Sequence, residues 1–177
     1  MKANKQFFFF FFKAIGIYLI WFVCYDLWLK KVGDVDEYLI NNLVYLAFEG
    51  LSFLGYFVNM DGFKLSIVGA KAGVRVGSGC NGLELLALFS GFVLVFEGSW
   101  KHKVWFIPAG IIILHFFNVL RIMALAVNGL TSKVMLEFNH KYTFTIILYC
   151  FTFSGWYVWV KYFSNIQSDH HENTISE

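Results

Sequence analysis

The sequence is poor in charge, in proline and in paired cysteines. Of its 177 residues 15% are charged, the net charge is +2, and one proline is present. Because no basic tract is available to bind nucleic acid, we expect no nucleic-acid partner. Three cysteines without a C-x-x-C pair form neither a zinc site nor a dithiol oxidoreductase. We therefore expect no metal and no cofactor.

Apolar residues are abundant instead. Hydrophobic residues make up 58% of the chain and aromatic residues 21%, more than a soluble domain of this length could bury in one core. Several apolar runs are about 20 residues long, which is enough to cross the hydrocarbon core of a bilayer. We predict an all-α membrane protein, a bundle of four to five transmembrane helices. One integral membrane domain covers residues 1–163, and a disordered cytoplasmic tail follows at 164–177.

Four segments are predicted to span the membrane, at about 7–29, 83–96, 104–127 and 142–162. The first could instead be a cleaved signal peptide. No small-x-small cleavage site follows it, however, and Trp21, Tyr25 and Trp28 resemble interfacial anchors. Residues 38–58 have apolar positions at helical spacing with polar residues between them. This pattern predicts an interfacial amphipathic helix or an additional span.

Residues 62–77 have a strand pattern rather than a helical one. Phe63, Leu65 and Ile67 alternate with other residues, and a second short alternating run follows the glycine-rich turn at 69–73. We predict a short β-hairpin here. An open hairpin would leave backbone groups unpaired in hydrocarbon, so it must lie in water or at the interface.

Basic residues predict the orientation in the membrane. Lys101 and Lys103 lie in a short loop, which the positive-inside tendency assigns to the cytoplasm. The segments on either side of this loop then reach the outer face, where Cys80, Arg121 and His140 come together. The lysine-rich amino terminus starts in the cytoplasm if the segment 38–58 lies on the outer surface. If this segment crosses the membrane instead, giving five spans, an external amino terminus would keep Cys80 outside as well.

Cys80 stands in a glycine-rich loop, 77–82, directly before an apolar helix. The glycines permit unusual backbone angles and close approach of another chain. The positive end of the helix dipole favours thiolate over thiol, and free backbone amides there could hold an oxyanion. On these features alone, a nucleophile and a small buried residue at a helix start are equally plausible.

Further polar residues point to chemistry near the outer face. Asn118 and Arg121 share one helix face, and with His115 they suggest a polar cluster, although an arginine reaching toward lipid headgroups is the alternative. A guanidinium there could stabilise a thiolate or a developing oxyanion. His140 opens the last span and is our preferred general base, over the deeper His115; a loop histidine without a role is the alternative.

Glu84 lies one helical turn after Cys80. A carboxylate at this distance disfavours a thiolate unless a cation, such as Arg121 or Arg75, offsets it. An orienting role and a purely structural ion pair are equally plausible for this residue.

These residues resemble the exosortases and archaeosortases, polytopic membrane cysteine enzymes that are functional analogues of sortases on an unrelated helical fold. The resemblance rests on the G-C-N-G motif at 79–82, the N-x-x-R motif at 118–121 and His140, in that order. It covers roughly residues 53–159. The short chain is most similar to the compact exosortase-related proteins of Bacteroidetes-type bacteria.

The resemblance implies a cysteine peptidase and transpeptidase of the cytoplasmic (inner) membrane whose active site faces the periplasm or exterior. Its partners would be exported proteins with a carboxy-terminal sorting signal: a short motif, a transmembrane helix and a basic tail. It implies that Cys80 is the nucleophile, Arg121 the cationic stabiliser and His140 the acid and base. Asn118 and Asn81 would support them, although serine is common in the family at the position of Asn81. The alternative is a non-catalytic subunit of a secretion or polysaccharide-export complex.

Overall fold

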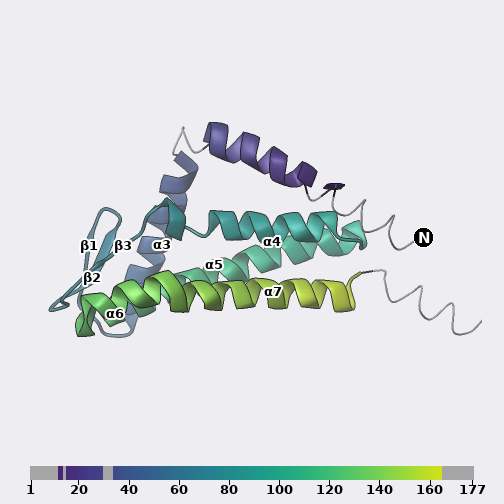
Figure 1. Ribbon diagram of the computed structural model, residues 1–177. Coiled ribbons are helices and arrows are strands. Elements are labelled where there is room, and N and C mark those ends of the chain that lie inside the picture. Colours follow the sequence, from purple (N-terminus) through teal and green to yellow (C-terminus); the bar gives the residue numbers. More distant parts are fainter. Residues whose placement is uncertain (1–11, 14, 30–33, 165–177) are drawn as a thin grey trace, which may run out of the picture.

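A computed structural model describes residues 12–13, 15–29 and 34–164 of the chain (Figure 1). Residues 15–21 are helical and continue into a π-helical segment, η1 (Phe22–Leu29). The later elements are α3 (Asp34–Phe53), β1 (Val58–Asp61), β2 (Lys64–Ile67), β3 (Val74–Arg75), η2 (Ser78–Cys80), α4 (Leu83–Val95), α5 (Trp100–Thr131), α6 (Lys133–Phe138), η3 (Asn139–Thr143) and α7 (Phe144–Tyr162). The start of the first predicted span and the predicted tail beyond Ser164 lie outside the described residues.

Two helices of the described chain are long and apolar enough to cross a membrane. One is α5, and the other is the continuous run Lys133–Tyr162 that α6, η3 and α7 form together. The predicted spans at 104–127 and 142–162 lie within them. The predicted span at 83–96 is α4, which has 13 residues, or about 20 Å at 1.5 Å per residue. This helix is shorter than the hydrocarbon core of a bilayer, which is about 30 Å thick.

Helix α3 begins and ends earlier than the predicted segment 38–58. Acidic residues fill its first turn, where they interact favourably with the positive end of the helix dipole. It ends at Phe53 because the chain then turns at Gly55, whose φ of +87° favours glycine. In Figure 1 α3 runs across the end of the bundle that α4, α5 and α7 form, rather than along those helices.

The predicted hairpin at 62–77 is part of a larger antiparallel sheet with the strand order β1-β2-β3. β2 and β3 pair as predicted, with Leu65 opposite Val74. The additional strand β1 pairs with β2 through a two-residue turn that starts at Gly62, whose φ is +54°. The predicted helix 38–58 therefore ends at Phe53, and its last residue, Val58, is the first residue of a strand.

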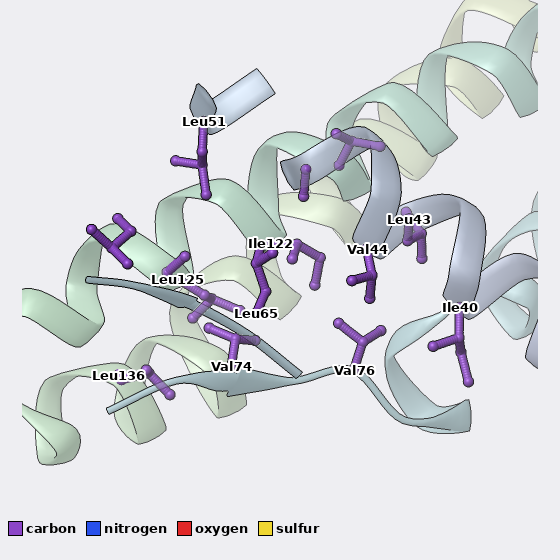
Figure 2. Packing of buried hydrophobic residues seen from close by; sticks show 14 residues of the cluster. Ile40, Leu43, Val44, Leu51, Leu65, Val74, Val76, Ile122, Leu125 and Leu136 are labelled. Carbon is purple, nitrogen blue, oxygen red and sulfur yellow. The ribbon is translucent and has the colours of Figure 1, made fainter. Parts of the chain in front are cut away.

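Two apolar clusters hold the elements together. In the first, α3, the sheet, α5 and α6 bury a common core, and Figure 2 shows Val74 and Val76 directed toward Ile122 and Val44. In the second, α4, α5 and α7 pack around Phe89 and Trp159. The first cluster fixes the sheet and the loop after it against α5, while the second fixes α4 between α5 and α7.

Candidate active site

The three predicted catalytic residues lie together at the sheet end of the bundle. The Sγ atom of Cys80 is 2.9 Å from Nε2 of His140. The guanidinium of Arg121 lies beside the same sulfur, and its Nη2 lies 3.5 Å from the carbonyl oxygen of His140. Cys80 comes from η2, Arg121 from α5 and His140 from η3, so the fold assembles the group from three elements.

Hydrogen bonds within the cysteine loop fix its conformation. The Cys80 amide donates to the carbonyl of Gly77 at 2.9 Å, which closes the single turn of η2. The Leu83 amide donates to Oδ1 of Asn81 at 2.9 Å. Two of the amides that the sequence offers to an oxyanion are therefore already bonded. Among the groups that contact the sulfur, the guanidinium of Arg121 is a donor suited to developing negative charge.

One polar face of helix α5 packs against the cysteine loop. As the spacing predicts, Asn118 and Arg121 share this face, and both are buried. Nδ2 of Asn118 donates to the carbonyl oxygen of Cys80 at 3.1 Å. His115 lies on α5 as well, but its Nε2 is 2.9 Å from Oδ1 of Asn42 in α3. It therefore links two helices, and the histidine at the sulfur is His140.

His140 sits in a π-helical turn between α6 and α7, before the apolar residues 142–162 of the last predicted span. Its carbonyl oxygen accepts a hydrogen bond from Oγ1 of Thr145 at 3.2 Å. In its neutral form the imidazole can accept the proton of the thiol through Nε2, the nitrogen that faces the sulfur.

A cavity of about 100 Å³ opens beside the cysteine loop, between α4 and α7. Its lining residues are Ser78, Gly79, Asn81, Gly82, Glu84, Leu85, Arg121, Thr145, Leu148 and Tyr149. The cavity has room for several water molecules or a small side chain. Glu84 lines it as an exposed residue, and the described part of the chain shows no ion pair for its carboxylate. Its position is that of a group at the entrance of a binding site.

Two residues near the cysteine, Asp36 and Tyr25, were not predicted from the sequence. The buried carboxylate of Asp36 accepts hydrogen bonds from the Tyr25 hydroxyl at 2.9 and 3.1 Å. It also accepts one from Nδ2 of Asn81. The sequence reads Tyr25 as an interfacial anchor and Asp36 as one of several acidic residues before a helix. Only the fold brings them to Asn81, because the contact joins segments 45 positions apart.

Within the described residues, no group of three or more His, Cys, Asp or Glu side chains is arranged to hold a metal ion. The chemistry that the assembled residues allow is thiol chemistry. A thiol, an imidazole and a guanidinium in mutual contact can form a nucleophile, transfer its proton and stabilise negative charge.

In a comparison with protein families, the family model described as transmembrane exosortase matches residues 4–156. Neither the curated proteins nor the solved structures compared with the chain give a match.

Proposed function

The chain belongs to the transmembrane exosortase family, and on this basis we propose that it is a membrane cysteine transpeptidase that cleaves exported proteins near a carboxy-terminal sorting signal. The observation that carries the proposal is the 2.9 Å contact between Sγ of Cys80 and Nε2 of His140, with Arg121 at the same sulfur. A nucleophile and a base within hydrogen-bond reach, with a cation beside them, is the arrangement that covalent catalysis requires.

In the first step, Nε2 of the neutral His140 accepts the proton of the Cys80 thiol. The resulting thiolate attacks the scissile carbonyl carbon, and a C–S bond forms as the carbonyl oxygen becomes an oxyanion. The guanidinium of Arg121 stabilises the thiolate and then the oxyanion, because it carries fixed charge and several donors.

In the second step, the C–N bond breaks and His140 returns the proton to the leaving amine. The carboxy-terminal fragment, with its transmembrane helix and basic tail, departs, and the amino-terminal product remains as a thioester on Cys80. An acceptor nucleophile then gives up a proton to His140 and attacks the thioester. The C–S bond breaks, Cys80 leaves as the thiolate and takes the proton from His140, and the cycle is complete.

The proposed orientation places this site at the outer face of the cytoplasmic membrane. Lys103 and Arg121 lie 18 positions apart in α5, or about 27 Å at 1.5 Å per residue, close to the thickness of the hydrocarbon core. The buried Lys103 bonds to the carbonyls of Leu94 and Phe96 at 2.8 and 2.7 Å, so the end of α4 lies at the same, cytoplasmic level. In this orientation α3, which runs across the bundle end in Figure 1, is the interfacial helix.

The cavity between α4 and α7 supports this proposal as a seat for the sorting motif. It lies between the cysteine loop and the two helices, so a peptide there would have its carbonyl near Cys80. In the proposed orientation the cysteine loop lies at the outer end of α4. A substrate whose transmembrane helix follows directly after the motif would reach a site at this level.

The test is to trap the thioester. The chain is co-expressed with an exported reporter that ends in the sorting-type segment of a co-encoded protein, and membranes are denatured without reducing agent. The proposal predicts a covalent adduct of reporter and chain that neutral hydroxylamine cleaves. Reporter processing by the Cys80→Ala variant, which cannot form the thioester, would mean that another protein does the chemistry.

A further inference from the structure

A buried polar contact near the cysteine involves a carboxylate that the proposed mechanism does not use. Asp36, in the first turn of α3, is 8% exposed. Both of its oxygens accept hydrogen bonds from the Tyr25 hydroxyl, and Oδ1 also accepts one from Nδ2 of Asn81. Among the described residues no cation forms an ion pair with it. A buried carboxylate is costly unless hydrogen bonds satisfy it, so this one is held by neutral donors.

Asn81 transmits this contact to the cysteine loop. Its amide is 1% exposed; it donates to Asp36 through Nδ2 and accepts from the Leu83 amide through Oδ1 at 2.9 Å. A carboxylate can only accept hydrogen bonds, so it fixes which end of the Asn81 amide faces α3 and which end faces the start of α4. The residue that precedes Asn81 is Cys80.

We infer that Asp36 and Tyr25 are positioning residues, which act through Asn81 to hold the Cys80 sulfur against His140. Tyr25 belongs to the helical segment before α3, Asp36 to α3, and Asn81 to the loop before α4. The hydrogen bonds therefore connect η1 and α3 to the loop that carries Cys80. The inference rests on the proposed function for its meaning, but the geometry it describes can be tested without a substrate.

The test uses the pH dependence of thiol alkylation. Four charged or titratable groups lie around Cys80: His140 of η3, Arg121 of α5, Glu84 of α4 and, through Asn81, Asp36 of α3. If the sulfur lies against His140, the imidazole can accept the thiol proton as the sulfur attacks N-ethylmaleimide, so alkylation at pH 6 keeps an appreciable fraction of its rate at pH 8.5. The ratio of the two rates is insensitive to changes in access, because access affects both rates equally.

The experiment is performed on the full chain in membranes, with Cys24 and Cys150 replaced by serine. Asp36→Ala removes the charged acceptor of the Asn81 amide, so the loop can move and carry the sulfur away from His140. The rate ratio should therefore fall by about tenfold. His140→Ala should lower it in the same way. Asp36→Asn should restore most of the ratio, because an amide oxygen can still accept from Asn81 and Tyr25. Tyr25→Phe should give a smaller decrease.

Two matched controls separate positioning from general damage. Glu37→Ala removes an exposed carboxylate from the same turn of α3, and Tyr18→Phe removes an exposed hydroxyl from the same helical segment as Tyr25; both should leave the ratio unchanged. An unchanged ratio in Asp36→Ala, or a decrease that Asp36→Asn does not reverse, overturns the inference. Neither result would affect the proposed function, which depends on the thioester adduct at Cys80.

Discussion

The sulfur of Cys80 lies 2.9 Å from Nε2 of His140, although 60 positions separate the two residues in the chain. Two constraints produce this contact. Bonds to the loop from α5 and α3 fix the cysteine, and the π-helical turn at the junction of α6 and α7 carries the histidine. A π-helical turn often accompanies a functional site, because it changes the direction of side chains within an otherwise regular helix.

Replacement of the nucleophile should abolish processing. Cys80→Ala should reduce cleavage of a sorting-signal reporter by a factor on the order of 10⁴ or more, as removal of other covalent nucleophiles does. The measurement is the fraction of reporter processed in cells, with membrane levels of the chain determined by immunoblot. Cys150→Ser, which changes an exposed cysteine of α7, is the control and should process normally. Undiminished processing by Cys80→Ala would favour a non-catalytic subunit.

Loss of the base should be nearly as severe. His140→Gln should slow cleavage by about 10²–10⁴-fold, the usual contribution of general acid–base catalysis. His102→Gln, at the other end of the bundle, should have no effect. Cleavage by His140→Gln at the wild-type rate would contradict this assignment.

The shape of the cation should matter as well as its charge. Arg121→Gln should lower the cleavage rate by about 10²–10³-fold, as loss of an oxyanion donor does. Arg121→Lys should be intermediate, because lysine keeps the charge but not the planar arrangement of donors that contacts both the sulfur and the His140 carbonyl. Arg75→Gln, at an exposed position of β3, is the matched control. Equal rates for Arg121→Lys and Arg121→Gln would show that charge plays no part.

Filling the cavity should separate substrate binding from thiol reactivity. Leu148 is buried and lines the cavity, whereas its neighbour Ile147 is 41% exposed. Leu148→Trp should reduce reporter cleavage at least tenfold, while N-ethylmaleimide should still label Cys80, and Ile147→Trp should change neither. If tryptophan destabilises the chain through overpacking, Leu148→Phe gives a milder test. Normal cleavage by a well-folded filled variant would place the sorting motif elsewhere.

The sequence alone predicts the residues of the site better than the elements that carry them. Cys80, Arg121 and His140 stand out because each is a reactive side chain at the end of an apolar segment, and Asn118 follows from helical spacing. The pairing of β2 with β3 follows from alternation around a glycine-rich turn. Strand β1 was missed because its first residue, Val58, continues the helical spacing of the apolar positions in 38–58, while residues 59–61 precede the alternating pattern of the predicted hairpin.

Long-range contacts account for the rest of the differences. Nothing local distinguishes Asp36 from the other acidic residues at the start of α3, since its role depends on Asn81 and Tyr25 approaching from other segments. The predicted span 83–96 is one residue longer than α4, which ends at Val95. Two of the amides that were predicted to be free for an oxyanion, those of Cys80 and Leu83, are bonded within the loop.

A last prediction concerns the close approach of the cysteine loop to α5. Gly82 has a φ of +81°, and a Cβ added there would lie 2.8 Å from Nδ2 of Asn118. Gly82→Ala should therefore lower the free energy of unfolding by about 1–3 kcal/mol through backbone strain alone. It should also displace the Asn118 amide from the Cys80 carbonyl. Gly77→Ala is the control, because its backbone is extended and nothing lies within 4 Å of an added Cβ.

The double variant distinguishes steric displacement from backbone strain. Asn118→Ala removes the amide that a Cβ at position 82 would meet, so the steric part of the Gly82→Ala effect should disappear in the combination. Thermal unfolding in detergent should then show that the double variant loses less stability than the two single variants lose together, because residues in contact are not additive. Strict additivity would mean that strain at φ +81° explains the whole effect, and that Asn118 does not need the space that Gly82 leaves free.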